Sequence, residues 1–323
     1  MSGSPAEDGP PAPGEERALR LGTRASALAL AQSGMVAAAV TAATGRVVEL
    51  VHVTTYGDTS REALSVIGGT GVFVNALRDA LYAGDIDFAV HSLKDLPTAA
   101  PEGLYLAAVS ERAAVNDALV ARDGLKLADL PTRARVGTGA ARRMALLKQI
   151  RQDLEVVPIR GNVDTRINHV RTGNLDAVVV ALAGLQRLGR ADEATEVFGP
   201  DVMLPSPGQG ALAVECKDPE LVGVLAVLDD PPTRAAVVAE RTMLAVLEAG
   251  CSAPVGGHAI ALDDNVLSLT GVVATVSGSR GLRLSRNGEI GEPEALGRRV
   301  AEALLAEGAA EIMQSAQSME AGA

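Results

Sequence analysis

From residue 18 onward, short apolar runs typical of strands alternate with longer segments typical of helices. The first series predicts strands over 19–21, 47–53 and 88–90, and helices over 27–41 and 72–82. The second series predicts strands over 118–120, 134–136, 156–159 and 177–182, and helices over 140–149 and 163–171. This strand-helix-strand order is typical of a parallel sheet with helices on both faces. The sequence therefore predicts two similar α/β domains.

A Pro/Gly-rich segment at 206–210 interrupts the alternation, and a strand-like run over 211–214 follows it without a helical partner in the second series. We expect this run to cross back and pair in the first domain. Such a crossing predicts a hinged, two-lobed molecule with a cleft. The expected divisions are a disordered leader at 1–17, domain 1 at 18–110 plus about 210–228, domain 2 at 111–209 and domain 3 at 229–323.

The last part of the chain predicts a small α+β domain. A long Ala-rich helix from 231 to about 249 is expected to close at Gly250 in the left-handed conformation. Strands are predicted over 258–261, 266–273 and 282–284, before a single terminal helix over about 294–317.

Composition narrows the classes of partner. With a net charge of −11, 2% aromatic residues and no Trp, the chain repels polyanions and lacks the stacking surfaces that single-stranded nucleic acid needs. No segment approaches the roughly 18 uninterrupted apolar residues of a membrane helix, and the N-terminus lacks the features of a secretory signal. Four scattered histidines and two cysteines without paired spacing argue against a metal site and a disulfide framework. We expect a cytoplasmic protein without nucleic-acid, membrane or metal partners, in which local arginines can still bind a small anion.

Ionisable side chains gather where the predicted strand 88–90 ends. Ser92, Lys94 and Asp95 follow that strand, and Pro97 prevents a regular element from continuing through them. In an open α/β sheet, ligands bind at this end of the strands. The alternative is a solvated Lys-Asp pair in a loop, but only four lysines occur in the whole chain and one of them stands here. We therefore predict a functional site at this turn.

Three predicted strand-to-helix turns carry arginines where the start of a helix disfavours them. Arg24 precedes the first helix, Arg142 and Arg143 open another, and Arg160 and Arg166 flank the start of a third. The partial positive charge at a helix N-terminus makes arginine unfavourable there by roughly a few tenths of a kcal/mol, so an anion should compensate. Free N–H groups and guanidinium groups together suit carboxylates or phosphates. These turns predict a ligand with several acid groups; the alternative is that the arginines only decorate the surface.

The two cysteines have different settings. Cys216 belongs to a buried strand and is best interpreted as a small core residue. Cys251 follows the helix-closing Gly250 on a predicted loop, where a thiol can act as a nucleophile or an attachment point. Judged from its neighbouring residues alone, Cys251 could equally be an incidental exposed thiol with no chemical role.

The ordered motifs together resemble the porphobilinogen deaminase family, also called hydroxymethylbilane synthase. The resemblance runs from Leu19 to the C-terminus and is carried by RASALALAQ at 24–32, GGTGVF at 68–73, AVHSLKDLP at 89–97, the Arg142-Arg143 turn, RGNV at 160–163, PGQG at 207–210 and Gly250-Cys251. It implies a three-domain protein whose first two α/β domains resemble type II periplasmic binding proteins.

The resemblance also implies the chemistry. Members of the family join four porphobilinogen molecules head to tail, with loss of ammonia, into linear hydroxymethylbilane, which water releases. The chain grows on a dipyrromethane cofactor bound by a thioether to a cysteine that matches Cys251. Asp95 matches the catalytic carboxylate, which hydrogen-bonds the pyrrole N–H, stabilises the azafulvenium cation and assists proton transfers.

Further positions match binding residues of the family. Cofactor-binding positions match Ser92, Lys94, Thr138, Arg142, Arg143, Arg160 and Gln209, and substrate-binding positions match Arg24, Ser26, Phe73 and Arg166. Each pyrrole carries two carboxylates, so the arginine turns gain counterions. The resemblance implies a monomer.

The chain departs from the family pattern at two places. Thr70 stands where members often have Lys, and Gly139-Ala140 stand where they often have a Ser pair. The first change removes a positive charge from the loop that contains Thr70, which the resemblance identifies as a lid. The second removes hydroxyl groups that could bind a carboxylate of the cofactor. Two alternatives to an active enzyme are therefore a non-catalytic two-lobed protein that binds a small carboxylate, and a relative that has lost activity.

Overall fold

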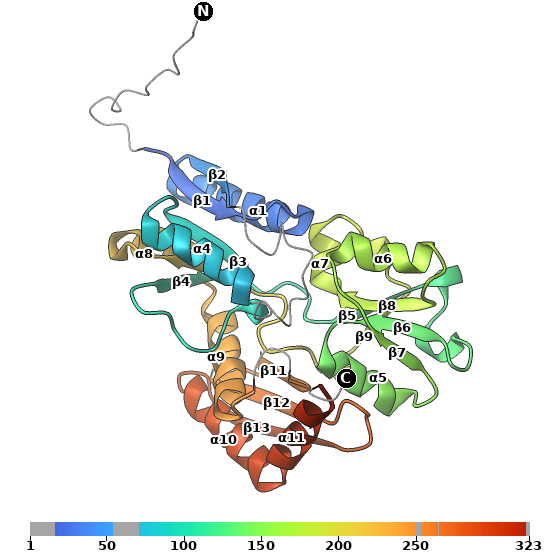
Figure 1. Cartoon of the computed structure of the whole chain (residues 1–323). Helices are drawn as coiled ribbons and strands as arrows, with labels where there is room; N and C mark the ends of the chain where they lie inside the picture. Colours follow the sequence, from blue (N-terminus) through green and yellow to red (C-terminus); the bar gives the residue numbers. More distant parts are fainter. Residues whose placement is uncertain (1–16, 54–70, 250–252, 264, 321–323) are drawn as a thin grey trace, which may run out of the picture.

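The computed structural model describes residues 17–53, 71–249, 253–263 and 265–320, which form two α/β lobes and a smaller C-terminal domain (Figure 1). Both lobes contain a five-stranded sheet, and the third domain contains a three-stranded sheet. The predicted architecture, two similar α/β domains followed by a small α+β domain, is confirmed.

The first sheet has the strand order β2-β1-β3-β10-β4. Its strands are β1 (Leu19–Thr23), β2 (Val48–His52), β3 (Phe88–Ser92), β4 (Tyr105–Val109) and β10 (Leu212–Cys216). Strand β1 pairs in parallel with β2 and β3, whereas β10 runs antiparallel to both β3 and β4. The run after the Pro/Gly-rich segment thus crosses back into the first sheet, as its sequence predicts.

The second sheet repeats the same plan, with the order β7-β6-β8-β5-β9. Its strands are β5 (Asp117–Ala121), β6 (Arg135–Thr138), β7 (Glu155–Pro158), β8 (Ala177–Ala181) and β9 (Glu196–Phe198). Here β6 is parallel to β7 and β8, and β5 is antiparallel to β8. The carboxyl ends of the parallel strands therefore meet at one edge of each sheet.

Helices cover both faces of the two sheets. The helices of the lobes are α1 (Ala27–Thr44), α4 (Gly71–Ala83), α5 (Ala141–Ile150), α6 (Val163–Arg171), α7 (Leu182–Arg187) and α8 (Pro219–Leu225). Side chains of α1 and α8 share one apolar cluster with the first sheet, and α4 packs on its other face. On the second sheet, α5 covers one face, while α6 and α7 cover the opposite one.

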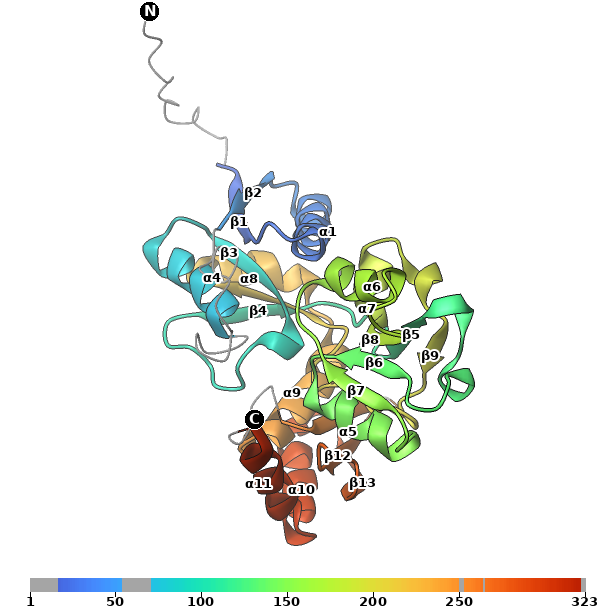
Figure 2. The ribbon, with the colours of Figure 1, turned by 45° about the vertical axis from the view of Figure 1, so that its right-hand side comes forward.

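The third domain packs beneath both lobes (Figure 2). Its elements are α9 (Pro231–Val246), β11 (Val255–Ala261), β12 (Val266–Ala274), β13 (Gly281–Glu289), α10 (Pro293–Ala306) and α11 (Ala309–Glu320). Val272 of β12 reaches the core of the second lobe, and Val237 of α9 joins a core of the first. The three domains therefore share apolar contacts.

Two predictions for this domain are corrected or fall outside the described residues. The expected single terminal helix is two helices, because Gly308 has φ of +97° and ends α10. Helix α9 ends at Val246, before the expected end, and Glu248 has the left-handed φ of +51°. Gly250, which the sequence suggested as the closing residue, lies outside the described residues.

Helix α1 meets the length and composition of a membrane span, which the sequence analysis did not expect. Its 18 residues have a mean hydropathy of 1.5, the only such helix in the part of the chain that the structure describes. It lies on the first sheet, with Val36 and Val40 in the core, and its buried Ser33 donates to Thr23 Oγ1 at 2.9 Å. We interpret α1 as a core helix of the first lobe.

Candidate functional site

The functional residues suggested by the sequence come from the carboxyl ends of parallel strands in both lobes. Strand β3 leads into Lys94 and Asp95 in the first lobe, and β6 leads to Thr138 and α5 in the second. Contacts described below join these ends across the junction of the lobes. The sheet topology therefore brings together residues that are distant in the sequence.

Asp95 ends a single 3₁₀ turn, Leu93–Asp95, that follows β3. Leu93 is fully buried, and its N–H donates to the carbonyl of Ala211 at 3.1 Å, so the turn is anchored to the segment entering β10. The Asp95 side chain is half-buried. Within the described residues, no group donates a hydrogen bond to its carboxylate, which therefore remains able to accept one.

Lys94 points to the junction of the lobes. Its Nζ donates to Oε1 of the buried Gln209 at 3.3 Å. Burial lowers the pKa of Lys94 to about 8, the neighbouring Asp95 opposes that shift, and Arg142 and Arg143 add to it. The site around Lys94 thus combines low exposure with other positive charges.

Arg142 and Arg143 lie on α5, where they are almost fully buried and share one counterion, Asp117. Arg142 Nη2 lies 2.7 Å from Asp117 Oδ2, and Arg143 Nη2 lies 2.7 Å from Asp117 Oδ1. Gln209 Nε2 also donates to Asp117 Oδ1, at 2.9 Å. Although burial raises the pKa of Asp117, the two guanidinium groups outweigh it and hold that pKa below its usual range.

This pairing revises one step of the sequence argument. The arginines of this turn were expected to need an anionic ligand as their counterion, and Asp117 supplies one inside the protein. The sequence argument missed Asp117 because it opens β5, far from the turn, and nothing local marks a buried aspartate as an arginine partner. A ligand role for Arg142 and Arg143 stays a prediction.

Arg166 brings a further positive charge from α6. Its Nε donates to the carbonyl of Gly161 at 2.9 Å. Burial and Arg143 lower the pKa of Arg166, and the negative charge of Asp95, from the other lobe, opposes that shift. Arg160, just after β7, is exposed at the same edge.

The β6–α5 turn is tightly packed at Gly139. A Cβ at this position would lie 2.6 Å from the carbonyl oxygen of Ile159, closer than real Cβ contacts. Thr138 is fully buried, and its Oγ1 accepts from the N–H of Ala140 at 3.3 Å. The first of the two positions where the family often has Ser is thus one where this chain has no room for a side chain.

On the first lobe, Arg24 and Ser26 follow β1. Ser26 caps α1, since its side chain accepts from the N–H of Ala29 at 3.3 Å. Arg24 is half-buried between β1 and α1. Ser92 accepts a hydrogen bond from Gln32 Nε2 at 3.0 Å, which ties the end of β3 to α1.

Arg187 is a candidate that the sequence analysis did not select. It ends α7, the helix that follows β8, and its Nη2 donates to the carbonyl of Gly210 at 2.6 Å. Burial lowers its pKa, and its buried Nε has no hydrogen-bond partner among the described residues. The signal that marked the other arginine turns is absent here, because Arg187 lies in the last turn of α7, where the helix dipole favours a positive charge.

Some predicted residues lie outside the description. These are Thr70 and Cys251, together with the side chain of Phe73. Cys216 is fully buried in β10, as predicted, and burial raises the pKa of its thiol to about 11. The part of the chain that the structure describes holds no cluster of three or more metal-binding side chains.

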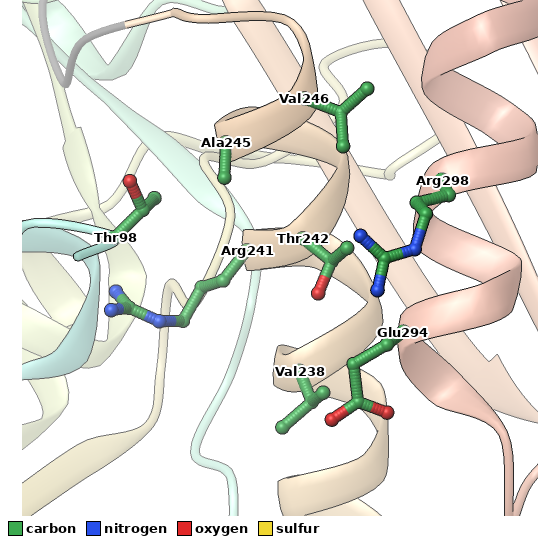
Figure 3. A pocket seen from close by; sticks show the side chains of 8 residues that line it. All are labelled: Thr98, Val238, Arg241, Thr242, Ala245, Val246, Glu294 and Arg298. Atoms are coloured by element: carbon green, nitrogen blue, oxygen red, sulfur yellow. The ribbon is translucent and has the colours of Figure 1, made fainter. Parts of the chain in front are cut away.

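A hollow of about 400 Å³ lies elsewhere, between α9 and α10 (Figure 3). It is lined by Thr98, Val238, Arg241, Thr242, Ala245, Val246, Glu294 and Arg298. None of the residues selected from the sequence lines it. The charges at the junction of the lobes, rather than this hollow, define the candidate site.

Comparison with known proteins assigns the chain to a family. Residues 19–221 match the family model "Porphobilinogen deaminase, dipyromethane cofactor binding domain", and residues 234–306 match "Porphobilinogen deaminase, C-terminal domain". The chain belongs to the porphobilinogen deaminase family. Its relatives in that family include porphobilinogen deaminase 1 of Streptomyces coelicolor, 60% identical over 312 residues, covering 92% of this chain and 98% of the relative. Porphobilinogen deaminase of Thermobifida fusca is 54% identical over 307 residues, covering 92% and 96%.

Distant matches occur among solved structures. A periplasmic substrate-binding protein from Coxiella burnetii is 14% identical with a TM-score of 0.42, covering 69% of this chain and 96% of that one. A likeness at this level carries no argument. The porphobilinogen deaminase assignment rests on the family models and relatives, which do not favour a non-catalytic binding protein.

The described residues fit the cofactor that the porphobilinogen deaminase family implies. Among the described residues, the charges of Lys94, Arg142, Arg143 and Arg166 interact with those of two carboxylates, Asp95 and Asp117, so basic groups outnumber acidic ones in this set. Burial is the main cause that lowers the pKa of Lys94 and of Arg166; Arg143 lowers both further, and Asp95 opposes both shifts. Such a site suits a dipyrromethane, whose pyrroles carry several carboxylates.

Proposed function

We propose that this chain is a transferase that joins four porphobilinogen molecules head to tail, with loss of ammonia at each step, into linear hydroxymethylbilane. The observation that carries the proposal is the meeting of Asp95 with an excess of basic side chains at the junction of the lobes, in a chain that matches both porphobilinogen deaminase family models. We place the activity in a cytoplasmic monomer with the three-domain division expected from the sequence.

We propose that Cys251 holds the dipyrromethane by a thioether bond. The described residues on either side of it, at the end of α9 and the start of β11, support this assignment. A Cβ at Gly256 would lie 3.2 Å from Cδ of Arg142, so the chain reaches the basic cluster within five residues of Cys251. When bound, the dipyrromethane supplies the pyrrole carbon to which the first substrate unit is joined.

The basic side chains bind and orient the acid groups. We assign Ser92, Lys94, Thr138, Arg142, Arg143, Arg160 and Gln209 to the cofactor, and Arg24, Ser26, Phe73 and Arg166 to porphobilinogen. Arginine guanidinium groups bind carboxylates through two parallel hydrogen bonds, which fixes the orientation of each pyrrole ring. Because Asp117 already holds Arg142 and Arg143 in place, little reorganisation accompanies binding.

Asp95 performs the charge stabilisation and the proton transfers. Its carboxylate can accept the pyrrole N–H of porphobilinogen and lies where a positive charge develops as ammonia leaves. A half-buried carboxylate stabilises that cation more strongly than water does, because the surroundings have a low dielectric constant.

Two measurements test the proposal. Intact-protein mass spectrometry should show an adduct of two pyrrole units that is lost in Cys251→Ser and kept in Cys216→Ala, a matched control at the buried thiol. No adduct, or an adduct that survives Cys251→Ser, would exclude Cys251 as the attachment point.

Turnover of porphobilinogen should fall to nearly nothing in Asp95→Ala and Asp95→Asn with the fold intact by circular dichroism. Asp85→Ala is the control, because Asp85 is an exposed carboxylate in the segment before β3. Substantial turnover in both Asp95 variants would remove Asp95 from its role.

A further inference from the structure

One arginine of the third domain holds the turn that carries Asp95. Arg241, on α9, donates from Nη2 to the carbonyl of Pro97 at 2.6 Å and from Nη1 to the carbonyl of Leu96 at 3.0 Å. Nη1 also lies 3.5 Å from the carbonyl oxygen of Leu93. Figure 3 shows the side chain extending from α9 toward the segment that contains Thr98.

The end of this turn needs such a donor. A short 3₁₀ turn leaves its last carbonyls without backbone partners, and Pro97 has no N–H with which to continue the ladder. The one backbone bond that closes the turn runs from Leu96 N–H to the carbonyl of Leu93, at 3.1 Å. The planar guanidinium group of Arg241 can serve neighbouring carbonyls at once, which the single ammonium of a lysine does less well.

Apolar packing reinforces the same contact. Val237 lies one helical turn before Arg241 and therefore on the same face of α9. It is buried in one cluster with Leu93 and Leu96, the residues on either side of Lys94-Asp95. The turn is thus fixed to α9 both by its side chains and by its carbonyls.

Helix α9 lies between this turn and the chain that leads to the proposed attachment point. Near its start, Asp229 Oδ1 accepts from the N–H of Val109 in β4 at 2.7 Å, which anchors the helix to the first lobe. At its other end the chain continues to Cys251, ten positions after Arg241. Glu240, next to Arg241, is fully buried and accepts from Gly208 N–H at 2.7 Å, so α9 has little freedom to rotate.

We infer that Arg241 is a positioning residue, which sets where Asp95 lies relative to the chain leading to Cys251 without itself contacting substrate. The inference rests on the proposed roles of Asp95 and Cys251. A misplacement of about 1 Å of a catalytic group can cost about 100-fold in rate.

The test compares Arg241→Met with Arg283→Met in the cofactor-loaded enzyme. Arg283 is a matched control, because it too joins the third domain to another by donating to two carbonyls, those of Asp201 at 2.6 Å and Pro200 at 2.8 Å. We expect Arg241→Met to keep the two-pyrrole adduct and the KM for porphobilinogen, and to lower kcat by about 100-fold. Arg283→Met should retain kcat, and Arg241→Lys should recover part of it.

Three results would overturn the inference. The first is a kcat in Arg241→Met no lower than in Arg283→Met. The second is a higher KM with kcat unchanged, which would make Arg241 a substrate ligand. If Arg241→Met does not fold, a folded Arg241→Lys with the kcat of the parent enzyme is the third. High activity in Asp95→Ala would instead refute the proposed function, whatever Arg241 does.

Discussion

The surroundings of Lys94 disfavour its charged form. Burial lowers its pKa from 10.5 to about 8, and Arg142 and Arg143 contribute in the same direction. Below about pH 8 the ammonium is charged in both the folded and the unfolded chain, so its burial penalty is present in full. Between about pH 8 and 10.5 only the unfolded chain keeps the proton, and this group's contribution to stability therefore becomes more favourable as pH rises.

Binding should show the opposite dependence on pH. If the Lys94 ammonium holds acid groups of the dipyrromethane, the rate at which the cofactor-free enzyme takes up its cofactor should fall as pH rises through about 8, because the ammonium loses its charge there. In Lys94→Arg the charge persists, since arginine remains protonated up to about pH 12. We expect its rate of cofactor uptake to stay flat over the same range. The same fall in Lys94→Arg would assign the titration to another group.

Single residues of the site differ in how well the sequence reveals them. The turn at Asp95 and the arginine turns could be found, because a break in apolar pattern and a charge at a helix start are local signals. Asp117 and Arg241 could not, because their importance lies in partners on other elements. Both residues occupy ordinary positions in a strand and a helix, so no local sequence pattern distinguishes them.

At the scale of elements, Gly308 sets the position of the turn between α10 and α11. Its φ of +97° is costly for any residue with a Cβ, although open space surrounds the position. Gly308→Ala should therefore reduce the free energy of unfolding by about 1–2 kcal/mol through backbone strain alone. Urea denaturation measures the change.

Gly291→Ala is the matched control. A Cβ there also meets open space, and its φ is not in the left-handed region. It should leave the free energy of unfolding nearly unchanged. Equal losses in both variants would show that the backbone conformation at Gly308 is not the cause.

Among elements, the sequence located most of the longer helices, but it missed two of the four edge strands of the lobes and two short helices. The expected helix over 163–171 coincides with α6, whereas β4 and β9 were missed. Each of these two strands lies at the edge of its sheet and has a single partner. Helices α7 and α8 were also missed, since they have six and seven residues and show too little periodicity to be detected.

At the scale of the whole molecule, Glu240 joins the third domain to the two segments that connect the lobes. Its fully buried carboxylate lies 2.6 Å from Arg112 Nη1 and accepts from the N–H groups of Gly208 and Ala259, at 2.7 Å each. Glu240→Gln leaves Arg112 buried without its counterion, so we expect a loss of about 3–5 kcal/mol in the free energy of unfolding. Urea denaturation and limited proteolysis between the domains measure the effect.

The control for this change is Glu193→Gln. Glu193 also pairs with arginines, Arg171 and Arg190, but its ion pairs are near the surface. Pairs of this kind contribute little, so its stability should change only slightly. If both glutamine variants are equally stable, the junction at Glu240 does not hold the domains together.

The order of domains was within reach of the sequence, whereas their contacts were not. Two βαβ series and a final α+β segment predict three units, because each pattern is periodic along the chain. Which side chains cross between units depends on distant pairings, such as that of Arg112 with Glu240. No local pattern specifies such a pairing.

The return of β10 to the first sheet has a consequence for biosynthesis. Strand β4 is at the edge of that sheet and pairs with β10, which follows the entire second lobe in the chain. As the polypeptide leaves the ribosome, the strands of the second lobe are all available before the first lobe receives its own last strand. The N-terminal lobe is thus translated first but completed second, and its unfinished edges must stay soluble while its neighbour is being made.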